Sequence, residues 1–332
     1  MRVAVLGGGA GARPHFKALQ RIEDVEFIAV AEINPERRAE IEATFGVRTF
    51  ADYRELLETC KPEAVLVALP HALHVEATLA CIEAGAHVLV EKPLAITVEG
   101  CDAIIRAAAA AGKTLAVGHT HHFIPGVMEA RDRVREGEVG DVLFATDCIH
   151  APYYTATRPR WFFDRAMAGG GSWVANGVHL VDRICWILDE LPRQVYARMT
   201  YHPEYPELEN SVTATFAFAS GRSATITMAM MENGRMEGGE IHGTKGSLRF
   251  SMSGKVSLGR GGEYTPLPVR YSHDARELQM REFVAAVRGE RPPAVTGEWG
   301  REVVRAVLAA YASHERGEAV ALDSAASGGR SA

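Results

Sequence analysis

The first third of the chain alternates short apolar runs with segments whose apolar residues recur at helical spacing. The apolar runs lie at 2–6, 26–31, 63–69, 86–90 and 114–119. Runs that are apolar along most of their length are typical of parallel strands covered on both faces. Because strands and helices alternate in this way, the pattern predicts an α/β fold built on a doubly wound parallel sheet.

Capping residues mark where several of these helices begin and end. Asn34 and Pro35 predict the N-cap and first residue of a helix that ends before Gly46. Thr97 predicts, in the same way, the start of an alanine-rich helix that ends at Gly112. The helices are therefore expected to be short and separated by tight turns.

The pattern changes near residue 122. A helix predicted at 125–136 and a strand at 141–149 lead into a loop rich in Tyr, Arg and Trp. Residues 172–188 then have the apolar spacing of one continuous helix. Since these segments no longer repeat the strand–helix unit, a second domain is expected to begin here.

From residue 193 the sequence is typical of antiparallel strands joined by hairpins. Ser220-Gly221 and the turn at 243–246 each separate two strand-like segments. The strand at 224–231 has few charges on either face, which favours burial of one face against a second subunit. Two further helices, at 274–288 and 298–316, are expected after the strands.

The first apolar run ends in a glycine-rich turn. Gly7, Gly9 and Ala12 occupy the three positions of the pattern G-x-G-x-x-A, and Ala10 and Gly11 lie between them. This pattern suits a tight turn, close approach of backbone to a pyrophosphate, and close packing of a helix on a strand. The free N–H groups of the following helix then face the phosphates. The turn therefore predicts a dinucleotide site.

Glu32 ends the second apolar run, about twenty residues after the glycines, as expected for a group that binds the adenosine ribose. A carboxylate there accepts hydrogen bonds from the ribose hydroxyls of NAD and repels the 2′-phosphate of NADP. NAD is the expected cofactor and NADP is less favoured, although Arg37 and Arg38 lie nearby in the sequence and soften the discrimination.

The third apolar run ends in Leu69-Pro70-His71, and His74 follows in the same loop. Residues past the carboxyl end of such a strand lie on the ligand side of the sheet. No Cys or carboxylate stands close enough in the sequence to complete a metal site with the histidines, so no metal is expected. These four residues are interpreted as cofactor-loop residues, with ordinary surface histidines as the alternative.

The fourth apolar run ends in Glu91-Lys92-Pro93. Lys92 stands at the carboxyl end of a buried strand, where open α/β sheets bind ligands. Its ammonium can lie over a reacting oxygen, which makes Lys92 a candidate catalytic residue, and Glu91 is counted with the cofactor site. The alternative is a lysine that only reaches solvent from the end of a strand.

The composition excludes several classes of function. The chain has 332 residues, 47% hydrophobic and 23% charged, as is typical of soluble globular proteins. A net charge of −6 indicates no nucleic-acid surface, and no apolar run approaches the roughly 20 residues of a membrane helix. The five cysteines form no CxxC pair, which favours buried thiols in a reducing compartment. Without a signal peptide, a cytoplasmic location is expected.

Several motifs coincide with those of one known family. They are the glycine loop, Glu91-Lys92-Pro93, the run Gly169–Gly171 followed by His179 and Asp182, and the turn at 243–248. In this order they resemble the Gfo/Idh/MocA oxidoreductases over nearly the whole chain. The resemblance implies a Rossmann domain that holds NAD(P), a C-terminal α/β domain with an open, mostly antiparallel sheet, and hydride exchange with a sugar, cyclitol or related polyol.

The resemblance also implies roles for particular residues and an assembly. Lys92 is expected beside the nicotinamide, often before a cis bond to Pro93, and His179 as the acid/base. The family association implies a homodimer through a sheet face, often paired into a homotetramer. The expected domains are a Rossmann domain at 1–121, a substrate-binding and oligomerisation domain at 122–323, and a flexible tail at 324–332.

Two positions depart from the family pattern. Ala175 stands four residues before His179, where members with a well-defined dehydrogenase site usually carry Asp. Asn176 can replace part of that polar role, although it projects about 100° further around an α-helix. Relatives often carry Arg or Asn where this chain has His121 and its neighbouring histidines, so an unusual substrate preference is expected.

These observations predict an NAD-dependent oxidoreductase acting on a secondary alcohol of a sugar-like molecule. His179 would take the hydroxyl proton, since an unperturbed imidazole pKa lies near neutrality, and Lys92 would hydrogen-bond the same oxygen. The other candidate site residues are His121, Tyr153, Arg160 and Asn176 for the substrate and Trp161 for the cofactor. Two alternatives stay open: a glycoside-cleaving or epimerising enzyme that oxidises its sugar transiently, and a catalytically weak NAD-binding sensor.

Overall fold

The computed structural model describes residues 1–231 and 234–322, and its backbone forms two compact units. Unit 1 contains Met1–Ile124, Ala166–Gly169 and Ser272–Val304; unit 2 contains Pro125–Arg165, Gly170–Tyr271 and the chain from Arg305 onward. This division differs from the predicted boundary at residue 121, because a later part of the chain returns to unit 1. The predicted tail at 324–332 lies outside the described residues.

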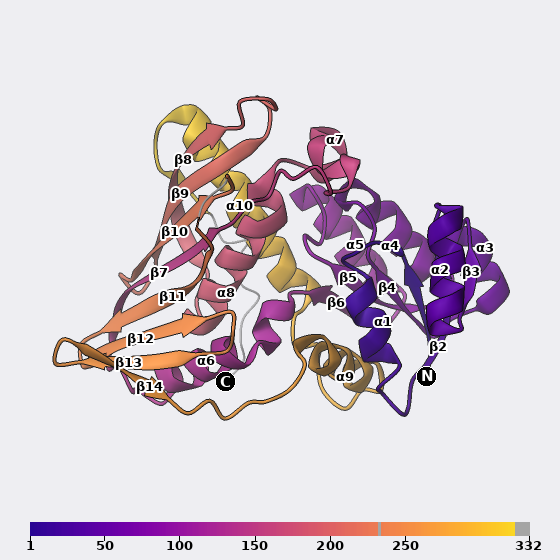
Figure 1. The fold of residues 1–332 in the computed structure, drawn as a ribbon, viewed down its shortest axis with the longest axis horizontal. Coiled ribbons are helices and arrows are strands. Elements are labelled where there is room, and N and C mark those ends of the chain that lie inside the picture. The colour runs from indigo at the N-terminus through magenta and orange to yellow at the C-terminus, as the bar shows by residue number, and fades with distance from the viewer. Residues whose placement is uncertain (232–233, 323–332) are drawn as a thin grey trace. The chain divides into compact units, whose positions relative to one another are not determined.

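Unit 1 is built on a six-stranded sheet in which every pair of neighbouring strands is parallel. The strand order is β3 (Arg48–Phe50), β2 (Glu26–Ala31), β1 (Arg2–Leu6), β4 (Ala64–Val67), β5 (His87–Glu91) and β6 (Leu115–Gly118) (Figure 1). Along the chain, strands are added first on one side of β1 (β2, β3) and then on the other side (β4, β5, β6), as in a Rossmann sheet. The predicted doubly wound α/β domain is confirmed.

The helices of unit 1 connect these strands and cover the sheet. They are α1 (Arg13–Leu19), α2 (Pro35–Phe45), α3 (Tyr53–Cys60), α4 (His74–Glu83), α5 (Val98–Ala110) and α9 (Ala275–Val287). The predicted caps are present: Asn34 Oδ1 accepts the Arg37 amide at 2.8 Å, and Thr97 Oγ1 accepts the Gly100 amide at 3.0 Å. Gly46, at φ 67°, ends α2 in the left-handed conformation.

The core of unit 1 explains why residues 272–304 belong to it. Val3 and Val5 of β1 are fully buried and pack with Phe16 of α1. Met280 and Phe283 of α9 join the same cluster, since α9 packs against α1. Burying these apolar side chains favours docking of α9 on the Rossmann sheet, a long-range contact that a linear domain boundary misses.

Unit 2 is built on a nine-stranded sheet. The strand order is β14 (Glu263–Leu267), β13 (Val256–Arg260), β12 (Gly246–Ser251), β11 (Met236–Gly243), β7 (Val142–His150), β10 (Ser223–Ala229), β9 (Glu209–Phe218), β8 (Pro192–Tyr201) and β15 (Val320–Ala321). Only the pair β7–β10 is parallel; every other neighbouring pair of the described strands is antiparallel. The predicted open, mostly antiparallel sheet is confirmed.

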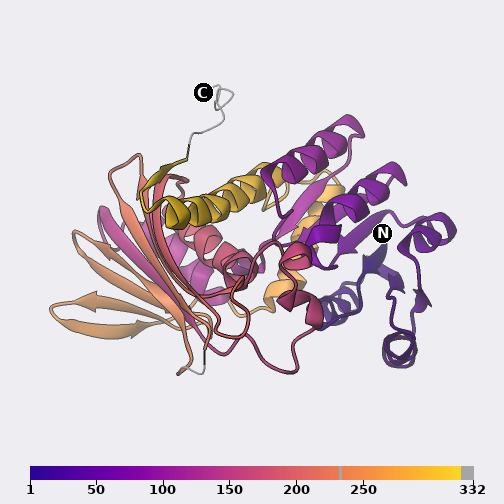
Figure 2. The same ribbon diagram turned by 90° about the horizontal axis from the view of Figure 1, so that it is seen from above.

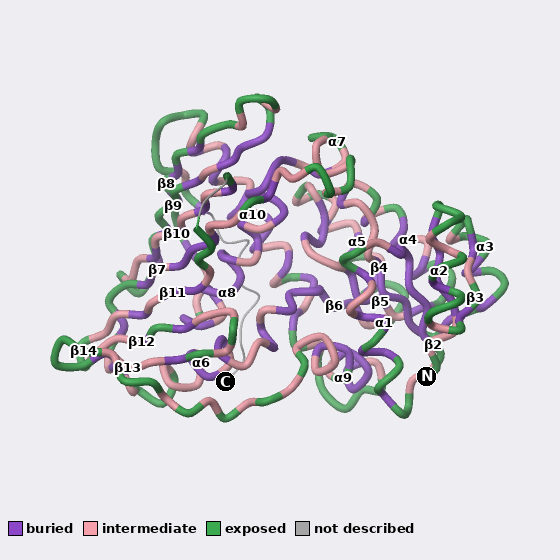
Figure 3. The backbone as a smooth tube through the Cα atoms, viewed as in Figure 1, coloured by how far each residue is buried: buried purple, intermediate pink, exposed green. Residues whose placement is uncertain are grey.

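One face of this sheet is covered by helices. Helices α6 (Pro125–Arg135) and α8 (Val178–Leu188) lie against it (Figure 2). In β10, Ala224 and Ile226 are buried on that side, whereas Thr225 on the alternate side is partly exposed. Figure 3 shows the same alternation of buried and more exposed positions along the neighbouring strands. The apolar–polar period of two is thus used to bury a single face of each strand.

The predicted continuous helix at 172–188 differs from the structure in its first turn. Residues Trp173–Gly177 form a π-helical turn, and α8 begins only at Val178. The remaining helices are α7 (Arg165–Ala168) and α10 (Gly297–Arg316), with short 3-10 turns at His71–Leu73, Thr120–Phe123 and Arg160–Phe163. Apolar spacing cannot separate a π-turn from an α-turn, because both bury residues three to five positions apart.

Candidate active site

The carboxyl ends of the parallel strands of unit 1 gather most of the predicted cofactor residues on one edge of the sheet. Gly7 follows β1, Glu32 follows β2, Leu69 lies just past β4, and Glu91 and Lys92 mark the end of β5 (Figure 1). Since all six strands are parallel, these positions share one edge, and open α/β sheets bind ligands there. The sequence prediction of a common edge is met by the topology.

The glycine loop has the geometry that a dinucleotide needs. The Gly7 amide donates to the Ala31 carbonyl at 2.8 Å, and a Cβ at Gly7, whose φ is +104°, would lie 2.2 Å from the Ala68 carbonyl oxygen. At Gly9 and Gly11 a Cβ would meet no atom within 4 Å. Gly7 therefore has no room for a side chain beside the carbonyl of Ala68, which follows β4, whereas Gly9 and Gly11 leave the loop backbone open. These residues fit a bound pyrophosphate.

Glu32 points back at the glycine loop. Its Oε2 accepts the Gly8 amide at 3.0 Å and the Arg37 guanidinium at 3.0 Å, and its Oε1 accepts the Asn34 amide at 2.9 Å. A carboxylate offers about four acceptor positions, so roughly one remains for a ribose hydroxyl. Arg38 instead donates to the Glu32 and Ile33 carbonyls. The structure thus places Glu32 beside the loop but already bonded to protein.

The two histidines of the loop after β4 are buried, which excludes the surface-histidine alternative. His71 Nδ1 lies 2.8 Å from the Ala168 carbonyl, and His74 lies 2.8 Å from the Pro93 carbonyl and 2.9 Å from the Leu69 carbonyl. Burial lowers the pKa of both, and that of His71 falls well below its usual value because His74 and Lys92 add positive charge nearby. His74 thereby ties the loop to the Lys92–Pro93 segment.

Lys92 is half-buried at the end of β5, and the Lys92–Pro93 bond is cis, as the resemblance implied. Glu91, which precedes it, lies 2.8 Å from Nε2 of His15, a fully buried residue of α1. Burial raises the pKa of Glu91, but the His15 hydrogen bond and the charges of His15 and Lys92 outweigh it, so the pKa lies below its usual value. A hydrogen bond between side chains thus connects the helix after the glycine loop to the Lys92 strand.

Sequence analysis did not identify His15 as a site residue. Its only signal is its place three residues after Ala12 on the face of α1 that faces the sheet, which an apolar side chain would normally occupy. Other buried polar groups lie after β6: His119, Thr120 and His122 are buried, and His121 between them is half-buried. Thr120 donates to Gln279 of α9 at 2.9 Å.

In unit 2, the π-turn and the start of α8 carry Asn176 and His179. Between Gly171 and Asp182, these two are the residues that are not fully buried. They stand three positions apart in the chain, Asn176 in the π-turn and His179 in the first turn of α8. Ala175 is 3% exposed, so the position where relatives carry Asp is buried here, and Asn176 is the polar neighbour of His179 that remains accessible.

The Tyr- and Trp-rich loop before α7 divides into packed and exposed residues. Tyr153 is buried, and the Arg158 guanidinium lies 3.7 Å from its ring centre. Burial raises the pKa of Tyr153. Trp161 stacks on Phe162, and Arg160 is exposed. The predicted contacts of Tyr153, Arg160 and Trp161 with ligands stay predictions, and Tyr153 has a packing role in its own loop.

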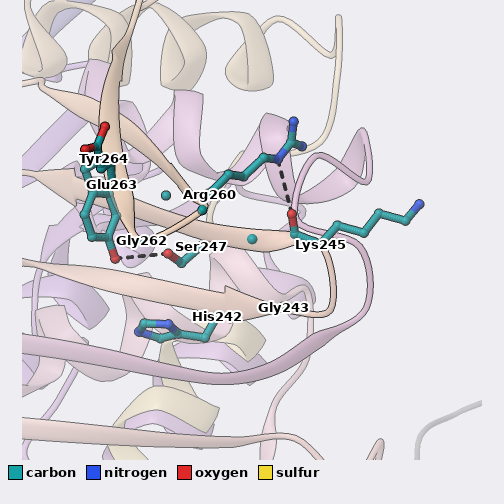
Figure 4. Close-up of a pocket in the computed structure, with 11 residues that line it drawn as sticks. His242, Gly243, Lys245, Ser247, Arg260, Gly262, Glu263 and Tyr264 are labelled. Atoms are coloured by element: carbon teal, nitrogen blue, oxygen red, sulfur yellow. Dashed lines mark hydrogen bonds between the residues drawn. The ribbon is translucent and has the colours of Figure 1, made fainter.

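Two cavities lie on the nine-stranded sheet, away from all the predicted site residues. One, of about 540 Å³, lies over β11 to β14, where Ser247 donates to Tyr264 and Arg260 donates to the Lys245 carbonyl (Figure 4). The other, of about 370 Å³, lies over β7, β10, β11 and β12. Neither contains Lys92 or His179, so cavity size does not locate the chemistry. No group of three or more His, Cys, Asp or Glu that could hold a metal occurs among residues 1–231 and 234–322.

Comparison with known proteins settles the family. Residues 1–119 match the model described as an oxidoreductase family with an NAD-binding Rossmann fold, and residues 127–249 match the Gfo/Idh/MocA C-terminal domain. The chain belongs to the Gfo/Idh/MocA oxidoreductase family. This confirms the predicted family, its two-domain α/β fold and the oxidoreductase class.

Members of the Gfo/Idh/MocA family match over most of the chain. A 1,5-anhydro-D-fructose reductase of Ensifer adhaerens is 30% identical over 328 residues, 96% of this chain and 98% of the relative. Inositol 2-dehydrogenase 3 of Saccharopolyspora erythraea is 30% identical over 267 residues, 79% of this chain and 76% of the relative. The crystal structure of an aldose-aldose oxidoreductase from Caulobacter crescentus, complexed with glycerol, has a TM-score of 0.89 at 25% identity and covers 97% of this chain and 99% of its own.

Cofactor chemistry is supported to the level of NAD(H). This rests on the family model, which describes an NAD-binding Rossmann fold. A levoglucosan dehydrogenase solved with NADH and L-sorbose has a TM-score of 0.88 at 21% identity, and this likeness shows the fold alone. The five cysteines are all buried free thiols, as expected. No helix within the described residues is long and apolar enough to cross a membrane.

Proposed function

We propose that this protein transfers a hydride between NAD and a secondary alcohol of a sugar, cyclitol or sugar derivative. The observation that carries the proposal is Lys92, half-buried at the end of β5 on the edge that also carries the open glycine loop. A cation at that edge is placed to stabilise the oxygen of an alcohol undergoing oxidation. The names of the relatives, which include a reductase and a dehydrogenase of such compounds, support the substrate class.

Each of the proposed site residues has one task in this reaction. Gly9 and Gly11 would hold the pyrophosphate of NAD and Glu32 the ribose, and bound NAD supplies the hydride acceptor. Lys92 donates a hydrogen bond to the substrate oxygen, while His179 accepts its proton. The alcohol carbon loses its hydrogen as hydride, so an alcohol is converted to a ketone with one proton left on His179. Lys92 belongs to unit 1 and His179 to unit 2.

A spectrophotometric screen tests the proposal. Purified protein with NAD is mixed in turn with myo-inositol, D-glucose, levoglucosan and the reduced form of 1,5-anhydro-D-fructose, and NADH is followed by its absorbance. Formation of NADH with at least one of these polyols is expected. If none of the four, nor a wider set of sugars and glycosides, reduces NAD or is consumed, the proposal fails.

A second candidate is a reaction in which the sugar is oxidised only transiently. A relative named 2,7-anhydro-N-acetylneuraminate hydratase is 27% identical over 253 residues, 73% of this chain and 68% of the relative. Hydration involves no net oxidation, so such an enzyme would return its hydride. Consumption of a sugar or glycoside without accumulation of NADH in the same screen favours this candidate.

NAD is the preferred cofactor in this proposal. Glu32 is 6% exposed and faces Gly8, so the 2′-phosphate of NADP would approach a buried carboxylate. Arg37 neutralises part of that charge at 3.0 Å, which reduces the preference without reversing it. A higher kcat/KM with NADP than with NAD contradicts this assignment.

The proposed working form is a homodimer or homotetramer in the cytoplasm, without a nucleic-acid or membrane partner. The sheet face opposite α6 and α8 carries exposed Phe144 and partly exposed Thr225 and Thr227, residues suited to meet a second sheet. Sedimentation at micromolar concentration should show at least a dimer; a monomer of 36.0 kDa contradicts the assembly.

A further inference from the structure

A buried carboxylate lies beneath the π-turn of unit 2 and has no role in the reaction just described. Glu209, the first residue of β9, is fully buried. Its Oε1 accepts the Trp173 amide at 2.6 Å, and its Oε2 accepts the Gly171 amide at 3.1 Å. One side chain therefore satisfies two backbone amides that enter the turn, 36 and 38 residues earlier in the chain.

The amide between these two is satisfied by a group that Glu209 also binds. The Ser172 amide donates to the Tyr154 hydroxyl at 3.0 Å, and that hydroxyl donates to the Glu209 carbonyl at 2.6 Å. The Ser172 hydroxyl donates to the same carbonyl at 2.9 Å. Helix-like turns leave their first N–H groups without an intrahelical partner, and here three in succession end on Glu209 or on a tyrosine bonded to it.

This cluster also explains the glycines that precede the turn. A Cβ at Gly171 would lie 2.5 Å from the Tyr154 hydroxyl and 2.9 Å from Glu209 Oε1. A Cβ at Gly170 would lie 2.4 Å from the Tyr311 hydroxyl. Side chains at these two positions would collide with Tyr154, Glu209 or Tyr311, so Gly170 and Gly171 are needed for these groups to approach the backbone.

The turn is equally fixed on its inner side. Trp173 is fully buried, and its indole Nε1 donates to the Val307 carbonyl at 3.0 Å. A Cβ at Gly177 would lie 2.1 Å from the Trp173 ring, which shows how closely the ring packs under the wide turn. Asn176 stays partly exposed in this turn, and so does His179 in the first turn of α8.

The middle of α8 has an anchor of its own. Arg183 Nε donates to Asp147 Oδ2 of β7 at 2.7 Å, and both side chains are fully buried. Because α8 is held to the sheet there, loss of the Glu209 contacts should move the π-turn and the first turn of α8, and leave the rest of the helix in place.

We propose that Glu209 is a positioning residue, whose buried carboxylate fixes the π-turn so that Asn176 and His179 are presented together to the substrate. The proposal rests on the function proposed above for His179. It assigns a role to a residue that touches neither substrate nor cofactor and acts only through the backbone of residues 171–173.

The test compares Glu209→Gln with Glu207→Gln, an exposed glutamate two residues earlier on the same strand approach. The NH2 of the glutamine side chain cannot accept an N–H, whereas its carbonyl oxygen can, so one of the two backbone bonds is lost while size is kept. We expect kcat, measured per NAD-binding site with the best polyol of the screen, to fall about 10- to 100-fold, the usual worth of a hydrogen bond to a charged group. The NAD affinity of Glu209→Gln and the kcat of Glu207→Gln should both match those of the wild type.

A second readout does not depend on activity. Hydrogen exchange followed by mass spectrometry should show faster exchange in peptides covering 169–178 of Glu209→Gln, and unchanged exchange in peptides of β1 and β5. A primary isotope effect on kcat with deuterated polyol should rise, because misplacement of His179 slows the chemical step, which a loss of folded protein would not do.

Tyr154→Phe provides a milder variant should Glu209→Gln fail to fold. It removes one hydroxyl from the cluster and should produce the same faster exchange at 169–178 with a smaller loss of kcat. Wild-type exchange and wild-type kcat in a folded Glu209→Gln protein overturn the inference. If the wild type itself oxidises no polyol, the proposed function fails, whereas the exchange measurement still decides whether Glu209 fixes the turn.

Discussion

Glu91, which is partly exposed, and Glu209, which is fully buried, are both carboxylates close to a residue assigned to the chemistry, but they act in different ways. Glu91 faces a second side chain, His15, at 2.8 Å, and these interactions lower its pKa despite burial. For Glu209 burial is the larger effect and raises the pKa, and the Trp173 and Gly171 amides offset it only in part. One site is a side-chain hydrogen bond between a strand and a helix; the other is a carboxylate that accepts backbone N–H groups.

The difference shows what each region must resist. The end of β5 is a regular parallel strand, so its direction is already set by the hydrogen bonds to β4 and β6, and the Glu91–His15 hydrogen bond joins it to the glycine-loop helix. The π-turn has no such ladder, and the Gly171 and Trp173 amides would lack their acceptors without Glu209. Removing the Glu91–His15 contact should therefore lower the free energy of unfolding, whereas removing the Glu209 contacts should displace the backbone of the π-turn.

The largest expected effect is the loss of the base. His179→Ala should lower kcat about 10²–10⁴-fold, the usual contribution of a general base. Glu209 acts on His179 only through the turn that precedes it. The fall in kcat should therefore be smaller for Glu209→Gln than for His179→Ala. Steady-state kinetics with both variants tests the ranking, and the reverse order would break it.

The next effect is on folding. His15→Leu leaves the Glu91 carboxylate without this hydrogen bond and should lower the free energy of unfolding by about 1.5–3 kcal/mol, the usual worth of a hydrogen bond to a charged group. Urea unfolding measures it, with Lys17→Ala on the exposed side of the same helix as the control. Equal midpoints for His15→Leu and Lys17→Ala would show that the pair contributes nothing.

The smallest expected effect is on the pH dependence of stability, to which Glu91 and Glu209 should contribute with opposite signs. The folded pKa of Glu91 is lowered, so its contribution to stability is present above its unfolded pKa, about 4.3, and is lost as pH falls through the folded value. The folded pKa of Glu209 is raised, so its contribution is present below about 4.3 and is lost as pH rises through the folded value.

Unfolding of Glu91→Gln and Glu209→Gln between pH 3 and 7 measures these opposite slopes. Relative to the wild type, Glu91→Gln should be most destabilised at neutral pH, and Glu209→Gln most destabilised in acid. Parallel slopes for the two variants would mean that the two carboxylates are held in the same way.

Much of unit 1 follows from local sequence, because its elements are specified by neighbours in the chain. The glycine turn, the Asn34 and Thr97 caps and the position of Lys92 all depend on residues within one strand–helix unit. What local pattern could not predict is the return of α9 to the sheet of unit 1, since the apolar face of Met280 and Phe283 does not indicate which sheet it covers.

The π-turn was predicted as ordinary helix for a physical reason. Its anchor, Glu209, lies in a strand more than thirty residues later, and a single glutamate before an alternating strand carries no sign that it will be buried. The only local signal was the run of three glycines, which indicates that something must approach the backbone closely but not what it is. The predicted roles of Lys92, His179 and the substrate-binding residues stay predictions.

The central claim is that Lys92 acts on the substrate oxygen and not merely at the end of a strand. Its most direct measurement is kcat of Lys92→Met together with the NAD dissociation constant of the same variant. The account predicts a fall in kcat of about 10²–10³-fold, as for loss of a group that stabilises developing negative charge, and NAD affinity close to the wild type. A Lys92→Met enzyme with near-normal turnover contradicts it.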